Sequence, residues 1–424
     1  MIPAVTRFIV VTELLTTILF LGNAKSVLAD WPEFRGPLAQ GIVPAAKIPA
    51  NWSERKNVLW RTELPGEGWS SPIVVGERIY LTTAIRSSTD VDKPDYDLSL
   101  LIVDANTGEL SKKVSLFAET GATSPSIHKK NSHASPTPVF DGKRLYIHFG
   151  HLGTACTDLD GTIVWRNGDL NYPPVHGNGG SPVVIDDLLI FSRDGSDIAE
   201  VIALDKATGK VRWQTPRETE ASRQFSFCTP LVIDAGGKQQ LILPGSNVVQ
   251  SLHPQSGKEI WRVTYDGYSV IPRPIYAQGL VYICTGYDRP SLLAIDPTGA
   301  GDVTQTHLRW QINTNVPHTP SLIAHDNQIT MISDHGVVSS VDALTGAELW
   351  KERVGGNYSA SPLLIGNQIF LVSEEGDCTI LEAGAAAKVI AKAKLDERCL
   401  ASPAMIGSNL LIRTAKSLVR FGAG

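Results

Sequence analysis

The sequence predicts an all-β protein: a single eight-bladed β-propeller of four-stranded blades, with an N-terminal strand closing the last blade. Three observations carry this prediction. A small residue followed by proline opens a short apolar run eight times, at intervals of roughly 41 to 48 residues after one longer gap. A hairpin signature with Asp, Gly and Trp recurs between these starts. The last repeat also lacks its outer strand. Repeats of this length are typical of propellers.

The first 29 residues have the features of an export signal. Arg7 precedes an apolar run over residues 8–22, and Val27-Leu28-Ala29 forms a small-residue cleavage site. We therefore expect a signal peptide at 1–29, an N-terminal extension at 30–51 and the propeller at 52–424, in a periplasmic or secreted protein. Glu13 interrupts the apolar run, so a retained signal anchor stays open. No later segment has the roughly 18 apolar residues that a membrane span requires.

The composition argues against several classes of function. The 424 residues carry a formal net charge of -5 without a long run of Lys or Arg, so we expect no nucleic-acid partner. The five cysteines are an odd number and form no CxxC pair, which favours buried structural thiols over a metal site. We expect a monomer.

Each predicted blade begins at one of the eight small-residue and proline pairs. The starts are Ser71-Pro72, Thr137-Pro138, Ser181-Pro182, Thr229-Pro230, Arg273-Pro274, Thr319-Pro320, Ser361-Pro362 and Ser402-Pro403. The longer first gap contains two insertions, over residues 87–97 and 119–131, which we expect to be loops. The array therefore has eight blades and no missing one.

The hairpin signature is clearest over residues 204–213 and 341–350. Its Asp is expected to accept backbone N–H bonds at the start of a turn, and its Gly to take the left-handed conformation that a side chain would penalise. After Ser402 the chain supplies only three strands, whereas residues 57–61 match the missing fourth strand. Pairing of these two segments would leave no free edge strand, so we expect the N-terminal strand to close the ring.

The element Asp-x-x-Thr-Gly-x-x-x-Trp resembles the tryptophan-docking repeat of quinoprotein alcohol dehydrogenases and, more distantly, of the outer-membrane assembly lipoproteins of the BamB family. Residues 31–37 and 130–138 are also similar to exported PQQ-like repeat proteins without an assigned activity. The resemblance runs from about residue 52 to 421. It implies that one tryptophan per repeat packs between adjacent blades. These residues are Trp60, Trp165, Trp213, Trp261, Trp310 and Trp350.

The same resemblance raises the question of a cofactor. A PQQ dehydrogenase of this superfamily carries a vicinal cysteine pair over the quinone, a calcium set of Glu, Asn and Asp, and a catalytic Asp. The sequence has no vicinal cysteines, and no segment matches the calcium set. We therefore assign no cofactor, no metal site and no catalytic residue, and keep PQQ with calcium as the alternative.

Candidate binding residues lie in the loops that a propeller gathers on one face. They are His133, His176, Arg193, Asp194, Tyr268, Arg273, Asp334 and Glu374. Arg273 replaces the small residue of the fifth blade start, and either an anionic ligand or an internal salt bridge would satisfy its guanidinium. Asp194, Asp334 and Glu374 stand in turns that contain Gly, so a turn role and a binding role both stay open.

Two functional hypotheses follow. The first is a binding or scaffold module of the cell envelope, whose loop-rich face takes a protein, a polymer or a small molecule. The second is a quinoprotein-type oxidoreductase. We prefer the first, because the chain has no nucleophile elbow, phosphate-binding loop, dinucleotide fingerprint or zinc-binding helix motif.

Overall fold

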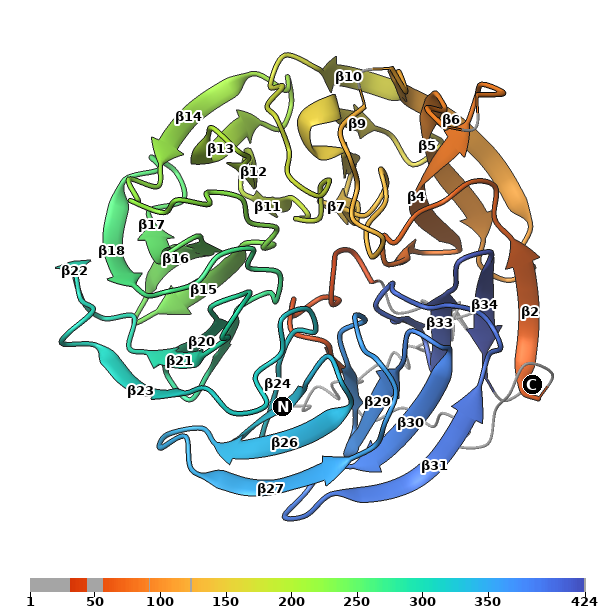
Figure 1. The fold of residues 1–424 in the computed structure, drawn as a ribbon. Coiled ribbons are helices and arrows are strands. Elements are labelled where there is room, and N and C mark those ends of the chain that lie inside the picture. Colours follow the sequence, from red (N-terminus) through yellow and green to blue (C-terminus); the bar gives the residue numbers. More distant parts are fainter. Residues whose placement is uncertain (1–30, 44–55, 91, 123, 423–424) are drawn as a thin grey trace, which may run out of the picture.

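The computed structural model describes residues 31–43, 56–90, 92–122 and 124–422. Eight sheets stand around a central channel and form a closed β-propeller (Figure 1). The predicted fold is therefore confirmed. The predicted export signal lies outside the described residues, and the division of the chain at residues 29 and 51 stays a prediction.

Each blade has four antiparallel strands, which follow one another from the channel outward. Blades one and two contain β3 (Ile73–Val75), β4 (Arg78–Arg86), β5 (Tyr96–Asp104), β6 (Leu110–Glu119), β7 (Val139–Phe140), β8 (Leu145–His148), β9 (Thr154–Thr157) and β10 (Ile163–Asn167). Blades three and four contain β11 (Val183–Ile185), β12 (Leu188–Asp194), β13 (Ala199–Asp205), β14 (Val211–Pro216), β15 (Leu231–Ala235), β16 (Lys238–Gly245), β17 (Val248–Leu252) and β18 (Glu259–Thr264).

The second half of the ring repeats the pattern. Blades five and six contain β19 (Ile275–Ala277), β20 (Leu280–Cys284), β21 (Leu292–Ile295), β23 (Leu308–Ile312), β24 (Ile323–His325), β25 (Gln328–Ile332), β26 (Val337–Asp342) and β27 (Glu348–Arg353). Blades seven and eight contain β28 (Leu363–Ile365), β29 (Gln368–Val372), β30 (Asp377–Glu382), β31 (Lys388–Lys394), β32 (Ala404–Ile406), β33 (Asn409–Arg413), β34 (Ser417–Phe421) and β2 (Val58–Glu63). The short strands β1 (Ile42–Val43) and β22 (Gly301–Asp302) add to blades seven and four. A 3-10 turn spans Gly150–Leu152.

The burial pattern explains why these segments form strands. Middle strands such as β20 and β21 are apolar along their whole length, because neighbouring blades cover both of their faces. Outer strands such as β10 and β23 alternate between more and less exposed residues, because only one face meets a neighbour. The core therefore lies between the blades, in clusters that each join side chains from two sheets.

The N-terminal strand closes the ring as predicted. β2 pairs antiparallel with β34, with Val58 opposite Phe421 and Glu63 opposite Ser417. The indole of Trp60 then reaches the next blade, where it donates to the carbonyl of Ala105 at 3.0 Å. Segments more than 350 positions apart in the sequence thus belong to one sheet.

The tryptophan of an outer strand contacts the signature turn of the following blade. Trp165, Trp213, Trp310 and Trp350 each donate to a backbone carbonyl there, at 3.0 to 3.1 Å. Trp261 differs from these four tryptophans. Its indole donates to the side-chain oxygen of Gln240, in its own blade, at 2.8 Å. In four such turns a Cβ on the glycine would lie 2.5 to 2.8 Å from the tryptophan ring, so the ring occupies the place of a side chain.

Residues 31–43 form a segment inside the channel, hereafter the plug, which the sequence did not predict. Trp31 pairs with Val74 of blade one, and β1 runs parallel to β28 of blade seven. The plug turns between Trp31 and β1. At this turn Arg35 donates to the carbonyl of Leu322 at 2.6 Å. Figure 1 shows this segment, coloured red, in the middle of the ring. The plug therefore ties distant blades together across the axis.

The start of blade six differs from the prediction by two residues. In the other blades the small residue lies two positions before the inner strand, as Ser361 does before Leu363. The equivalent residue before β24 is Ser321, because the inner strand begins at Ile323. The proline of Thr319-Pro320 thus precedes the serine in this blade, which the repeat spacing alone did not reveal.

Candidate functional site

A ring of hydroxyl groups surrounds one end of the channel. At six of the eight blade starts, the backbone N–H of the residue two positions before the inner strand donates to the hydroxyl of its counterpart in the next blade, at 2.9 to 3.0 Å. The bonds run from Ser71 to Thr137, Thr137 to Ser181, Ser181 to Thr229, Arg273 to Ser321, Ser321 to Ser361 and Ser361 to Ser402. The repeated small residues are thus inter-blade contacts, and Arg273 is the member that supplies no hydroxyl.

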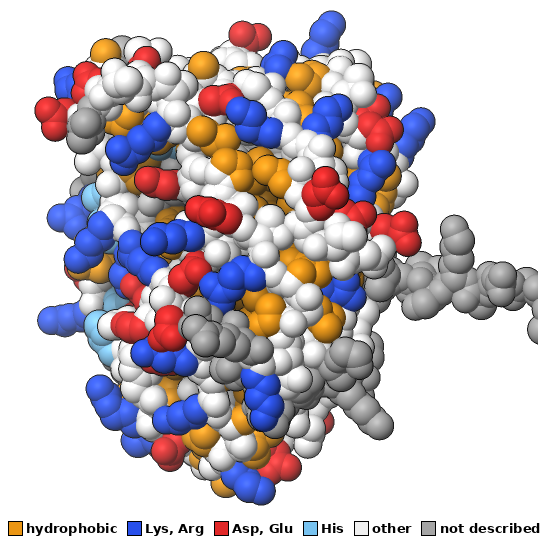
Figure 2. Space-filling model, turned by 90° about the vertical axis from the view of Figure 1, so that its right-hand side faces the viewer, with side chains coloured by type: hydrophobic (Ala, Val, Ile, Leu, Met, Phe, Trp, Pro, Cys, Tyr) orange, Lys and Arg blue, Asp and Glu red, His pale blue; other side chains and the backbone are white. Residues whose placement is uncertain are grey.

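Above this ring lies a cavity, hereafter the funnel, with a volume of about 1060 Å³. Seven of the hydroxyl residues line its lower part, and Phe34 of the plug lines its base. The walls come from the loops before the inner strands and from loops between second and third strands. Figure 2 shows histidine, lysine and arginine side chains along its left edge, the face that Figure 1 turns to the viewer. The hydroxyl residues and Phe34 therefore form the floor of the funnel, and the loops form its walls.

One wall of the funnel is a continuous arc of aromatic rings. Neighbouring centroids are 5.4 to 5.9 Å apart, and most pairs are edge-to-face, an arrangement that aromatic quadrupoles favour. The members in order are His128, His176, Phe225, Tyr268, Tyr287 and His318, contributed by loops of blades two to six. Trp69 also lines the funnel, and the guanidinium of Arg398 lies 5.7 Å from its ring.

Charged groups at the funnel are largely paired within the protein. Arg223 lies 4.7 Å above the ring of Tyr268 and donates to its hydroxyl, which in turn donates to Asp288 at 3.3 Å. Asp334 accepts from the backbone of His318 at 2.7 Å and lies 3.3 Å from its Nδ1. Burial would raise the pKa of Asp334, but the hydrogen bonds from His318 lower it below its ordinary value.

Three of the eight predicted binding residues line the funnel: His176, Tyr268 and Asp334. Two others lie at its margin. Glu374 pairs with Lys130 at 2.7 Å and accepts from Ser359 at 2.6 Å. His133 stacks on Tyr96 with centroids 4.4 Å apart, and burial lowers the pKa of His133 to about 4.

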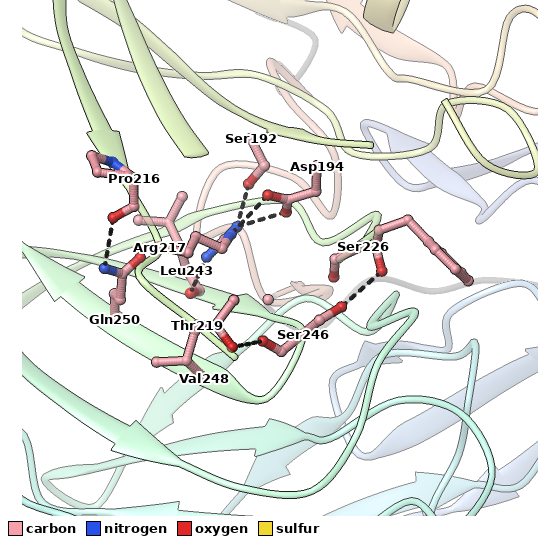
Figure 3. Close-up of polar contacts among 12 residues, drawn as sticks. Ser192, Asp194, Pro216, Arg217, Thr219, Ser226, Leu243, Ser246, Val248 and Gln250 are labelled. Atoms are coloured by element: carbon pink, nitrogen blue, oxygen red, sulfur yellow. Dashed lines mark hydrogen bonds and ion pairs between the residues drawn. The ribbon is translucent and has the colours of Figure 1, made fainter. Parts of the chain in front are cut away.

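Asp194 and Arg193 turn away from the funnel into ion pairs. The Asp194 carboxylate and the guanidinium of Arg217 form two hydrogen bonds of 2.8 Å, and both side chains are fully buried (Figure 3). Arg217 begins the loop that leads to Arg223 and Phe225, so this pair anchors a part of the funnel wall. Arg193 pairs with Glu200 of the adjacent strand at 2.8 Å.

Arg273 forms an internal salt bridge, one of the two alternatives that its position left open. Its guanidinium is 2.9 Å from Glu33 of the plug and donates to the carbonyls of Phe34 at 2.6 Å and Pro230 at 3.0 Å. The side chain is buried and does not line the funnel. The carboxylate that Arg273 holds is thus supplied by the chain itself.

Among the funnel residues outside the predicted binding set are His128, Lys129, Arg223 and Phe34. Two of them belong to the insertion over residues 119–131, which was predicted only as a loop. The insertion's length was a usable signal, because long loops beside a rigid scaffold often carry function. No local pattern indicated that Phe34 would enter the channel.

The residues present do not match the requirements of PQQ with calcium. Within the described ranges no group of three or more His, Cys, Asp or Glu side chains is placed to hold a metal ion. The five cysteines are buried and unpaired, and burial raises the pKa of Cys228 to about 12, so its thiol is protonated near neutral pH. We therefore derive no redox step for this funnel.

Comparisons with known proteins agree with this architecture. A family model described as the outer membrane protein assembly factor BamB matches residues 245–389. BamB of Burkholderia pseudomallei (strain K96243) is 23% identical over 397 residues, which cover 87% of this chain and 90% of that protein.

Two solved structures have similar folds. Quinohemoprotein alcohol dehydrogenase from Comamonas testosteroni has a TM-score of 0.66 and 12% identity, covering 93% of this chain and 80% of the other. BamB from Moraxella catarrhalis has a TM-score of 0.59 and 14% identity, covering 86% and 99%. Among the residues described, no helix is long and apolar enough to cross a membrane.

Proposed function

Because the chain is a β-propeller of the PQQ-like repeat family, we propose that it is a binding module of the cell envelope that holds its ligand in the funnel. The observation that carries this proposal is the arc of six aromatic rings, which five consecutive blades present to one cavity. Ligand sites are usually concave, mostly apolar and supplied with a few convergent polar groups. The funnel has these three properties.

The proposed place of action rests on two arguments. Residues 1–29 have the sequence features of a signal that directs a chain out of the cytoplasm. The similar BamB protein of Burkholderia pseudomallei is, by its name, an assembly factor of outer membrane proteins. We therefore place this protein in the periplasm or outside the cell, where its rigid ring presents the funnel loops to an envelope component.

Covalent labelling of lysine tests the proposal in the native envelope. Lys129 lines the funnel and is exposed, whereas Lys392 is exposed on the outer strand β31 and serves as the control. We expect Lys129 to react with an amine-selective reagent in the purified protein and to be protected in the envelope fraction. Lys392 should react equally in both. Equal labelling of Lys129 in the two samples would contradict a funnel-bound ligand.

A further inference from the structure

We propose that the funnel binds the end of a neutral saccharide chain. This inference rests on the function proposed above and names the class of ligand. Three features of the funnel point to it: an aromatic wall for apolar faces, a floor of hydroxyl groups, and charges of both signs. A polyhydroxylated ring offers both an apolar C–H face and many hydrogen-bonding groups, so it can use all three.

The size of the funnel favours a chain over a single small molecule. Its volume of about 1060 Å³ lies just above the roughly 300–1,000 Å³ usual for small-ligand pockets. The aromatic arc follows the wall through loops of five blades, so ring after ring is presented along one path. An extended ligand with repeating units can contact several of these rings at once.

The aromatic wall offers apolar contact surface. Tyr287 is 55% exposed and lies between Tyr268 and His318 in the arc, so its ring is accessible to a ligand. The C–H face of a pyranose packs on such a ring because both surfaces are apolar and contact removes water from them. Aromatic side chains also lose little conformational entropy when a ligand binds, since they have two rotatable bonds.

The floor offers matched polar partners. The hydroxyls of Thr137, Ser181 and Thr229 each accept one backbone N–H. A hydroxyl has one donor and two acceptor positions, so each of these groups keeps its own proton to donate. Sugar hydroxyls have the same dual capacity. A purely hydrocarbon ligand would instead bury the hydroxyl protons without an acceptor, at an energetic cost.

The charge distribution argues against a strongly charged ligand. The lining cations are Lys129, Lys130 and Arg223, and the lining carboxylates are Asp288 and Asp334. At the margin, Glu374 lies 2.7 Å from Lys130 and the guanidinium of Arg398 lies 5.7 Å from the ring of Trp69, which makes four cations and three carboxylates. A polyanion or polycation would meet repulsion as well as attraction in the funnel, because specificity for charge requires a complementary potential.

Isothermal titration of the purified protein with defined oligosaccharides tests this inference. The probes are hexasaccharides of glucose, mannose, xylose and N-acetylglucosamine, a hexamer of galacturonic acid, and an uncharged hexapeptide. We expect at least one neutral hexasaccharide to bind. Tyr287→Ala should weaken that binding about tenfold, equivalent to about 1.4 kcal/mol. Tyr287→Phe keeps the ring and should bind like the wild type. Leu349→Ala, an exposed change on outer strand β27, should also bind normally.

The outcomes separate this inference from the function on which it rests. Binding of the peptide or the galacturonate alone, lost in Tyr287→Ala, would overturn the saccharide inference and leave the funnel as a binding site. Neutral saccharide binding that Tyr287→Ala does not weaken would overturn it too, because the ligand would lie elsewhere. If no probe binds while Lys129 is protected in the envelope fraction, the saccharide inference falls and the binding module stands.

Discussion

Asp194, which was predicted as a binding residue, forms a structural ion pair and does not line the funnel. Its carboxylate is fully buried, and Arg217 satisfies both oxygens while also donating to the carbonyl of Leu243 at 3.0 Å. Burial raises the pKa of Asp194, and the charge of Arg217 opposes this shift. The pair fixes the start of the loop that carries Phe225 into the funnel wall.

Removing one partner of this pair is expected to be costly. Asp194→Ala leaves the guanidinium of Arg217 buried without a counter-charge, which typically destabilises a protein by about 3–5 kcal/mol. Asp187→Ala is the matched control, because Asp187 pairs with Arg212 on the exposed surface, where about 0–1 kcal/mol is usual. Urea unfolding at pH 7 measures both. Equal losses in the two variants would show that the buried pair has no special role.

Buried histidines predict that stability declines in acid. Burial lowers the pKa of His148 to about 3 and that of His151 to about 4, below the unfolded value of 6.5. The folded state therefore favours the neutral rings, and their contribution is present above pH 6.5 and lost as the pH falls toward 4. Each such histidine contributes about 1.4 kcal/mol per pH unit in that window.

Urea unfolding between pH 7 and pH 4.5 checks this prediction. His148→Gln should make the loss of stability with falling pH less steep, since one proton-binding group of the unfolded state is removed. His253→Gln is the control, because His253 lies exposed in a signature turn. An unchanged slope in His148→Gln would show that the buried ring of His148 does not contribute to the pH dependence of stability.

At the scale of elements, the contact between a tryptophan and a turn glycine joins one blade to the next. Gly108 has a φ of +77°, and a Cβ there would lie 2.6 Å from the ring of Trp60. The glycine is thus required twice, for its backbone conformation and for the space that the indole fills. The same contact joins the closing strand β2 to blade one.

Gly108→Ala separates these two requirements when it is compared with Gly76→Ala. Gly76 also has a positive φ, of +57°, but a Cβ added there would meet no atom within 4 Å. The left-handed conformation should cost about 1–2 kcal/mol in both variants. Displacement of Trp60 should add about 1–3 kcal/mol in Gly108→Ala alone. Equal unfolding midpoints in urea would show that the indole moves without cost.

The elements were predictable from the sequence because the same pattern of small residue, proline and apolar run recurs along the chain, with departures only in blades five and six. The strand that closes the ring was also predictable, since residues 57–61 match the strand missing after Ser402. The site was harder to predict. Asp194 and Asp334 stand at equivalent positions, yet one enters an ion pair and the other lines the funnel. Partners far apart in the sequence decide such outcomes, as with Arg273 and Glu33, which are 240 positions apart.

At the scale of the whole molecule, the plug is a contact between blades that do not adjoin. Arg35 of the plug and Arg273 beside the plug are both buried, and burial together with the neighbouring charge of Arg273 lowers the pKa of Arg35 to about 9. Arg35 donates to the carbonyl oxygens of Gln40 and Leu322, whereas Glu33 supplies a carboxylate to Arg273. The contacts of the plug inside the channel are therefore expected to contribute to the stability of the ring.

Glu33→Ala tests this coupling. It leaves the guanidinium of Arg273 without its carboxylate, which should lower the free energy of unfolding by about 1–3 kcal/mol. Leu38→Ala is the control within the plug, because Leu38 is 59% exposed and should change stability by less than about 0.5 kcal/mol. Urea unfolding compares the two. A neutral Glu33→Ala would show that the plug adds no stability through this ion pair.

The plug also distinguishes the two ends of the channel. The funnel opens where the inner strands begin, whereas Trp31 pairs with Val74 inside a strand and β1 ends beside Ile365, where an inner strand finishes. Both ends of the plug therefore point toward the side opposite the funnel mouth. A partner that bound the N-terminal end of the plug would therefore leave the funnel mouth accessible on the opposite side of the ring.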